Sequence, residues 1–169
     1  FPGNEKMISV EDRLDIMELL ARYGAGLDAR DWGLWRDVFT DQALFDLSSW
    51  NRLTPERVDT SRVVRAQARV FAELAVTQHM MSNFRISGET ESKARAIAVM
   101  RAEHWIRVSS DSDEMKRYTM FGYYDDLVVK QDGIWKIDEM HLNVTKTEGE
   151  RWVMLQAERR PRDKKKQES

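Results

Sequence analysis

Apolar residues near the start of the chain recur with the period of an α-helix. A serine three positions before an acidic residue, Ser9 before Asp12, has the spacing of a helix N-cap. We therefore predict a helix over residues 9–28. Its apolar positions are Leu14, Met17, Leu20, Ala21 and Leu27.

Shorter elements follow this first helix. Asp31 can cap a second helix. A third helix begins at Thr60 or Ser61, because apolar residues then recur at helical spacing. The second helix is predicted over 32–39. A strand over 43–47 and a loop over 48–59 separate it from the third helix.

After Val76 the pattern changes to the alternation typical of β-strands. Asp132-Gly133 is a strong hairpin turn between the last two strands. Helices followed by hairpin-linked strands predict an α+β fold, with an antiparallel sheet packed on three N-terminal helices. Strands this long must bend, so we expect the curved sheet to enclose a deep pocket. The predicted strands cover 77–87, 94–108, 118–130 and 134–146.

The chain is divided by this pattern into one domain and two short ends. We expect an N-terminal extension over 1–8, a domain over 9–157 and a basic tail over 158–169. The tail is rich in arginine and lysine with little that is apolar, so we interpret it as disordered and solvated, and less readily as a nucleic-acid arm.

Composition narrows the functional classes. Hydrophobic residues make up 41% and charged residues 33% of the chain, as in soluble globular proteins. The net charge of −2 gives no overall field that would attract nucleic acid. There are no cysteines and no apolar run long enough to cross a membrane, so we expect a cytoplasmic protein without disulfides or thiolate chemistry. Neither a glycine-rich phosphate loop nor Gly-x-Ser-x-Gly occurs, so we expect no nucleotide cofactor and no serine nucleophile.

Asp28 is an unexpected charge in the first helix. The helical period places it on the same side as Leu14, Met17 and Gly24. An unpaired buried carboxylate costs several kcal/mol, so it needs a partner. Gly24 would let a ligand or another backbone come close to it. The alternative is that the helix ends near Asp28 and the acid is solvated or caps the next segment.

The three histidines all fall on predicted strands. Period two places His79 on one face with Asn83, and His104 on a face rich in alanine. For any single histidine a structural role is the simpler interpretation, but an aspartate commonly orients a catalytic histidine. We therefore predict that Asp28, His79 and His104 face one pocket. Their spacing lacks the local pairs of metal sites, so we expect no metal.

Four patterns in fixed order resemble a known family. The chain resembles the SnoaL-like branch of the nuclear transport factor 2-like superfamily over 9–146, and is similar to scytalone dehydratase, hexachlorocyclohexane dehydrochlorinase and bile acid 7α-dehydratase. The patterns are Tyr23-x-x-x-x-Asp28 before Arg30-Asp31-Trp32, Phe39-x-x-x-Ala43-x-Phe45, His79-x-x-x-Asn83, and Tyr123-Tyr124-Asp125 before Asp132-Gly133-x-Trp135-x-Ile137.

The resemblance implies a cone of curved sheet closed by three helices, with Asp28 and His79 as a catalytic dyad. It also implies active-site roles for His104 and Tyr23. Leu27 and Leu47 stand where scytalone dehydratase has tyrosines that hold water. We find no counterpart of the arginine on the last strand of the dehydrochlorinase.

The expected function is a cofactor-independent lyase, a dehydratase, acting on a mostly apolar cyclic or aromatic small molecule. Migration of a double bond by an isomerase is the alternative within the same chemistry. The catalytic residues would be Asp28, His79 and His104. The expected substrate-binding residues are Tyr23, Asn83, Trp50, Phe71, Met100, Tyr123 and His141.

A non-enzymatic function stays open at this point. The domain could bind a hydrophobic ligand or serve as an assembly subunit, with Asp28 and His79 as a structural pair. A cavity filled by Trp50, Phe71 or Trp105 would favour this interpretation. We also expect a homo-oligomer, with a trimer favoured over a dimer, because the outer face of the sheet carries apolar residues among charges.

Overall fold

The computed structural model describes residues 8–159, so the predictions for residues 1–7 and 160–169 lie outside the described part of the chain. The helices are α1 (Val10–Ala29), α2 (Trp32–Asp37), α3 (Ser48–Asn51), α4 (Thr60–Phe71) and α5 (Trp152–Arg159). The strands are β1 (Phe39–Asp46), β2 (Glu56–Asp59), β3 (Val76–Thr90), β4 (Lys93–Arg107), β5 (Met115–Gln131) and β6 (Ile134–Gly149). The predicted α+β class is confirmed.

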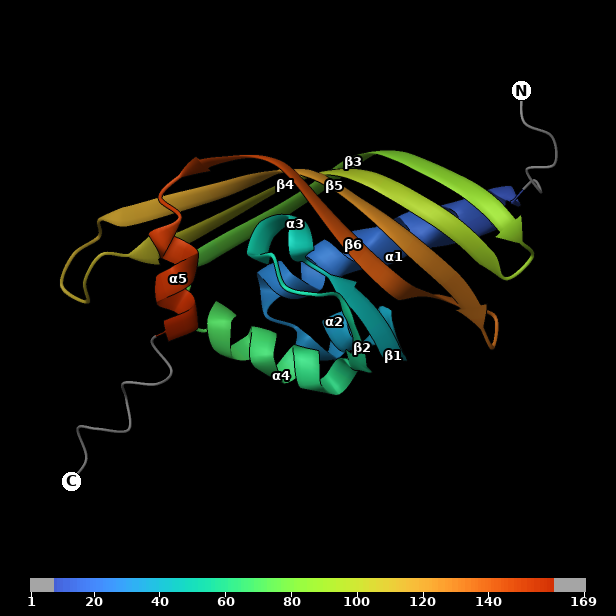
Figure 1. Cartoon of the computed structure of the whole chain (residues 1–169), viewed down its shortest axis with the longest axis horizontal. Helices are drawn as coiled ribbons and strands as arrows, with labels where there is room; N and C mark the ends of the chain where they lie inside the picture. Colours follow the sequence, from blue (N-terminus) through green and yellow to red (C-terminus); the bar gives the residue numbers. More distant parts are fainter. Residues whose placement is uncertain (1–7, 160–169) are drawn as a thin grey trace.

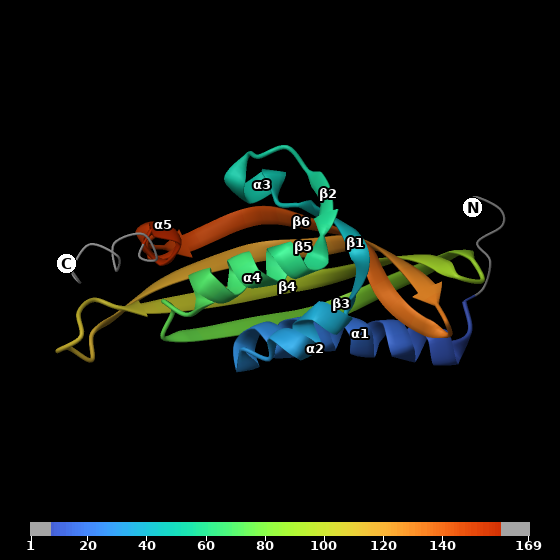
Figure 2. The ribbon, with the colours of Figure 1, turned by 90° about the horizontal axis from the view of Figure 1, so that it is seen from below.

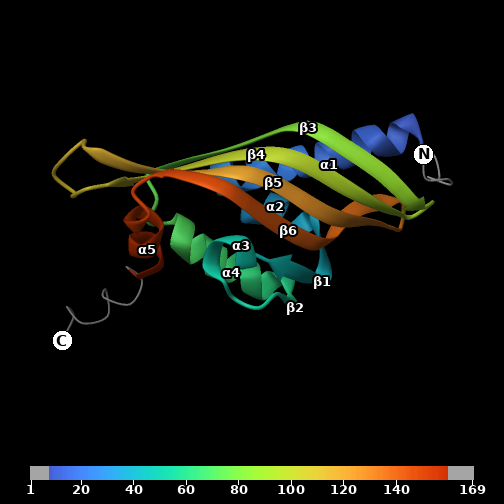
Figure 3. The ribbon, with the colours of Figure 1, turned by 45° about the horizontal axis from the view of Figure 1, so that its top comes forward.

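The six strands form one curved, unclosed sheet in the order β2-β1-β6-β5-β4-β3. All neighbouring strands are antiparallel except β1 and β6, which pair in parallel. The predicted antiparallel sheet is therefore wrong at this one pair. Figure 2 shows α1 lying along the edge strand β3 and α4 lying over the concave face of the sheet. The helices α3, α4 and α5 lie below the sheet in Figure 3.

The start of α1 agrees with the prediction, but the side that it buries does not. The Ser9 hydroxyl accepts a hydrogen bond from the Asp12 amide at 3.0 Å. Leu14, predicted to face the core, is 60% exposed. Asp28 therefore lies at the flank of the buried side rather than in its middle. The buried side chains of α1 are Ile16, Leu19, Leu20, Tyr23 and Leu27.

The loop predicted over 48–59 contains two short elements, α3 and β2. At the start of α3 the carboxylate of Asp46 accepts a hydrogen bond from the Ser48 amide at 3.0 Å. Strand β2 forms by pairing with β1, a contact that local sequence patterns cannot reveal. The last helix, α5, was also not predicted; it extends past residue 157 and buries Val153 and Met154. No helix within residues 8–159 has the length and apolar character needed to cross a membrane.

Two β-bulges change which alternate residues face the helices. In β3 the register shifts between Ser82 and Arg85, and Asn83 within the bulge has a φ of 52°. In β6 the residue Asp138 is paired with no residue of β5. Leu127 of β5 pairs with Glu139, and the next residue, Val128, pairs with Ile137. An extra residue on one strand reverses the period-two assignment beyond it.

The N-terminal end of α1 is fastened to the β5–β6 hairpin. One oxygen of Asp12 accepts hydrogen bonds from Lys130 Nζ at 2.6 Å and from Trp135 Nε1 at 2.8 Å. These two bonds, the lysine's first, lower the pKa of Asp12 to about 2. The carboxylate is therefore ionised throughout the neutral range and holds the helix to the sheet.

We expect Asp12→Asn to lower the free energy of unfolding at pH 7 by about 1–2 kcal/mol, because hydrogen bonds to a charged acceptor are lost. The folded pKa lies below the ordinary value, so this stabilisation is present above pH 4 and is lost as the pH falls toward 2. Urea denaturation at pH 7 and pH 2.5 measures the difference. Asp15→Asn, on the exposed side of α1, is the control. An equal loss at both pH values would contradict the prediction.

Candidate active site

Asp28 joins the last turn of α1 to the edge strand β3. One carboxylate oxygen, Oδ2, accepts a hydrogen bond from the His79 amide at 2.7 Å. The other, Oδ1, lies 2.7 Å from His79 Nδ1 and accepts a hydrogen bond from Thr77 Oγ1 at 3.0 Å. Because β3 has no strand on this side, the carboxylate satisfies a backbone amide that would otherwise be left without a strand partner. Asp28 thus holds both the backbone and the ring of His79.

Gly24 allows this contact to form. A Cβ atom at Gly24 would lie 3.2 Å from the His79 carbonyl oxygen and 3.4 Å from the His79 Cβ. The predicted close approach at this glycine is therefore made by the backbone of β3. Gly26 has a similar role on the other side, where a Cβ atom would lie 2.9 Å from the Cβ of Trp35 and would push α2 away.

The charge on Asp28 determines which nitrogen of His79 can act as a base. Burial raises the pKa of Asp28, but hydrogen bonds from the ring and amide of His79 and from Thr77 outweigh it and leave the pKa below its usual value. A carboxylate only accepts hydrogen bonds, so Nδ1 carries the proton and Nε2 keeps the lone pair. The Asp28 side chain is 26% exposed and that of His79 4%.

His104 lies next to His79 and is neutral. The two ring centroids are 5.4 Å apart, and His104 is 1% exposed. Burial, together with the neighbouring His79, lowers the pKa of His104 to about 3. The ring bonds to the backbone of Tyr118, whereas Nδ1 is buried with no partner among the described residues. The unpaired nitrogen can therefore accept a hydrogen bond but has no proton to give.

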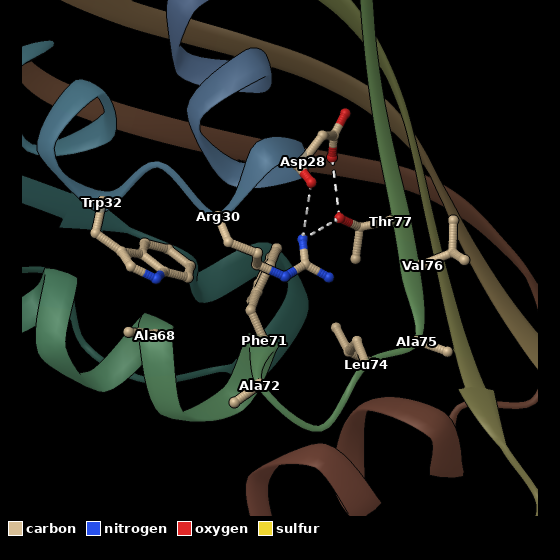
Figure 4. A pocket seen from close by; sticks show the side chains of 10 residues that line it. All are labelled: Asp28, Arg30, Trp32, Ala68, Phe71, Ala72, Leu74, Ala75, Val76 and Thr77. Carbon is tan, nitrogen blue, oxygen red and sulfur yellow. Dashed lines mark hydrogen bonds between the residues drawn. The ribbon is translucent and has the colours of Figure 1, made fainter.

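A pocket of about 510 Å³ opens at Asp28 and Thr77, between the end of α1, the end of α4 and the start of β3. Neither His79 nor His104 lines it. The ring of Phe71, 1% exposed, stacks on His79 with centroids 6.0 Å apart and an interplanar angle of 19°. Phe71 therefore separates the histidines from the pocket. Figure 4 shows the lining residues: Asp28, Arg30, Trp32, Ala68, Phe71, Ala72, Leu74, Ala75, Val76 and Thr77.

Three further predicted residues lie in or against the core instead of in the pocket. Tyr23 is buried, and its hydroxyl shares a hydrogen bond of 3.2 Å with that of Tyr124. Met100 is buried on the concave face of β4, and Trp50 of α3 is partly buried against the core.

The structure does not bring Asn83, Tyr123 or His141 to the pocket. Asn83 and Tyr123 border a hollow on the opposite face of the sheet. His141 lies 3.2 Å from Asp46 Oδ2 and 3.3 Å from Glu139 Oε2. The bulges in β3 and β6 displace Asn83 and His141, while Tyr123 alternates with the inward-facing Tyr124. Within residues 8–159 no group of three or more His, Asp or Glu residues is arranged to hold a metal ion.

Of the ten residues that line the pocket, only Asp28 and Phe71 were predicted as site residues, and the polar Arg30 and Thr77 were missed. Arg30 and Thr77 contact each other and line the pocket beside Asp28. Their positions in the sequence could have indicated that they lie near the site. Arg30 follows Asp28 by two positions, and Thr77 shares a strand face with His79.

A curved sheet with helices on its concave side is the fold of the nuclear transport factor 2-like superfamily, to which this chain belongs. Within it, the chain belongs to the family of the SnoaL-like domain, whose model matches residues 9–141. A comparison with curated proteins gives no match.

Solved structures share this fold. A candidate aromatic ring hydroxylase from Novosphingobium aromaticivorans is 27% identical, with a TM-score of 0.74 over 88% of this chain and 99% of that chain. A candidate scytalone dehydratase from the same organism is 20% identical, with a TM-score of 0.70 over 83% and 89% of the two chains. The hexachlorocyclohexane dehydrochlorinase LinA-type3 from Novosphingobium barchaimii is 14% identical, with a TM-score of 0.67 over 84% and 92%. The last two likenesses establish the fold alone.

Proposed function

We propose that the protein is a lyase or isomerase that removes a proton from a carbon atom of a mostly apolar cyclic substrate. His79 Nε2 is the base, and Asp28 orients the ring and stabilises the imidazolium that forms. The observation that carries the proposal is the double contact of Asp28 with the ring and the amide of His79, both at 2.7 Å, beside a pocket. A carbon next to a carbonyl is the suitable substrate position, because the carbonyl stabilises the negative charge that removal of the proton leaves.

Elimination of water is the first form of the reaction. The electrons of the C–H bond form a C=C bond as the neighbouring C–O bond breaks, and the proton held by His79 passes to the leaving oxygen. In the isomerase form the same proton returns to a different carbon. The elimination enzymes named among the structural neighbours support the first form through a shared fold only.

Access to His79 sets a condition on this mechanism. Phe71 must turn away from His79 before Nε2 can reach a substrate in the pocket, because the two rings are stacked. His104 Nδ1, which is unpaired, would then accept a hydrogen bond from a substrate hydroxyl. Burial of such an unpaired group costs free energy, so a polar substrate group is a fitting partner.

The same Phe71 contact favours a second candidate function, the binding of a hydrophobic ligand without catalysis. In that case Phe71 stays on His79, and the Asp28–His79 contact serves only to fasten α1 to β3. The two functions differ in whether His79 exchanges protons with a carbon acid.

Proton exchange tests the proposal without a known substrate. A panel of cyclic ketones is incubated with the protein in D₂O, and loss of the C–H signal next to the carbonyl is followed by NMR. We expect exchange above background, and a decrease of about 10²-fold in Asp28→Asn, which no longer fixes the proton on Nδ1. Asp46→Asn, which alters the other Asp–His pair, is the matched control and should change the rate less than about twofold. Absence of exchange, or equal rates in both variants, would favour the binding function.

A further inference from the structure

Arg30 is held in the pocket by one side of its guanidinium group. Its Nη1 donates hydrogen bonds to the Leu27 carbonyl and to Thr77 Oγ1, each at 2.7 Å. The guanidinium carbon lies 5.0 Å from the centre of the Phe71 ring. Figure 4 shows the guanidinium between Asp28 and the apolar wall of the pocket. These contacts fix both its position and the plane in which it lies.

The other edge of the same group has no partner. No acceptor within residues 8–159 contacts Arg30 Nε or Nη2, and the carboxylate of Asp28 is engaged by His79 and Thr77. Nε and Nη2 form an edge that matches a carboxylate with two parallel hydrogen bonds. Elsewhere in this chain, Arg95 uses that edge to bind both oxygens of Asp125.

The pocket around this free edge is lined by Asp28, Thr77 and apolar side chains, three of which are alanines. Burial lowers the pKa of Arg30, as expected for a cation that has lost part of its hydration. A partly desolvated guanidinium gains more from an anion than an exposed one does. The apolar residues of the lining are Trp32, Ala68, Phe71, Ala72, Leu74, Ala75 and Val76.

We propose that Arg30 binds a carboxylate group of the substrate through Nε and Nη2, so that the substrate is a small carboxylic acid with an apolar body. Binding of the carboxylate by Arg30 does not depend on the proposed function. The inference rests on that function only where it makes the bound acid the molecule from which His79 removes a proton. Its carboxylate pairs with Arg30, and its hydrocarbon part contacts the alanine, leucine and valine side chains. Arg30 is in this sense a specificity-determining residue.

Capping of α1 does not account for this arrangement. Arg30 does bond the Leu27 carbonyl at the end of the helix, but only Nη1 takes part. A lysine could cap the helix equally well, since cations of either kind are favourable at a helix C-terminus. The two-pronged edge that faces the pocket is the property that lysine lacks.

Binding of cyclohexanecarboxylate, compared with the uncharged cyclohexanecarboxamide of the same shape, tests the inference. The dissociation constants are measured by NMR titration of the wild type, Arg30→Gln, Arg30→Lys and His79→Gln, with the backbone amides of Ala75 and Thr77 as reporters. We expect the wild type to bind the acid at least about tenfold more tightly than the amide. Arg30→Gln should lose that preference, and Arg30→Lys should keep only part of it.

The His79→Gln protein separates this inference from the proposed function. It should keep the preference for the acid even though it cannot exchange protons with carbon. Arg95→Gln, which removes an arginine that binds a carboxylate through Nε and Nη2 away from the pocket, should bind like the wild type. Equal binding of acid and amide by the wild type would overturn the inference, as would an undiminished preference in Arg30→Gln. The NMR spectrum of Arg30→Gln itself shows whether this variant is folded, so that a loss of preference is not confused with unfolding.

Discussion

Replacement of His79 by glutamine is expected to lower the rate of proton exchange by roughly 10³–10⁴-fold, the upper part of the range for general acid–base catalysis. Glutamine can still donate a hydrogen bond to Asp28 and fill much of the space of the ring, but it has no basic nitrogen. The backbone amide of residue 79 continues to bond Asp28, so α1 should stay fastened to β3. Exchange measured by NMR in D₂O, together with urea denaturation, distinguishes a lost base from a lost fold.

The double variant sharpens this test. Because Asp28 acts through His79, the Asp28→Asn substitution should cost little more once His79 is glutamine. His141→Gln is the matched control, since His141 also contacts an aspartate but lies away from the pocket. Independent, multiplying effects of the two substitutions would show that Asp28 and His79 do not act as one unit. An unchanged rate in His79→Gln would exclude His79 as the base.

Replacement of His104 by glutamine is expected to flatten the dependence of stability on pH between about 6.5 and 4. The pKa of His104 is about 3 in the folded protein and about 6.5 in the unfolded chain. In this interval the unfolded chain binds one more proton, so the stabilisation is present above pH 6.5 and is lost as the pH falls toward 3. At pH 5 the wild type should have lost about 2 kcal/mol relative to pH 7 through this residue.

Urea denaturation at pH 7, 6 and 5 measures this effect. His104→Gln should be less stable than the wild type at pH 7, because glutamine fits a fully buried histidine site imperfectly. The difference between the two proteins should shrink at each step toward pH 5. His141→Gln, in which a half-exposed ring is replaced, serves as the control. Parallel pH curves for His104→Gln and the wild type would mean that His104 is not held neutral by burial.

The sequence predicted the four long strands and the residues of β4 that face the concave side, and there is a physical reason for this. Alternation is a local property, and nothing interrupts it between Ala94 and His104, where the alternate residues are all buried. It failed at Asn83 and His141 because each lies in or beyond a bulge. A bulge adds one residue without a distinctive local pattern, and its position is fixed by pairing with a strand distant in the sequence.

The pairing of Asp28 with His79 was predicted, although the prediction of which side of α1 is buried was wrong. The pattern predicts that Leu14 faces the core, but Leu14 is exposed. The buried side of α1 contains Ile16 and Leu19 instead. The resemblance to a known family supplied the pair, and the structure supplies its local cause in the packing of Gly24 against β3. The free edge of Arg30 could not be predicted, because it depends on how Thr77 and Phe71 meet in space.

The bond from the His79 amide to Asp28 has a consequence for solubility. β3 is an outer strand, and an outer strand with free amides is a template on which another chain can add its own strand. Asp28 occupies one of those amides, and α1 lies along the strand around it. Loss of this carboxylate would therefore leave that amide free to pair with a strand of another chain.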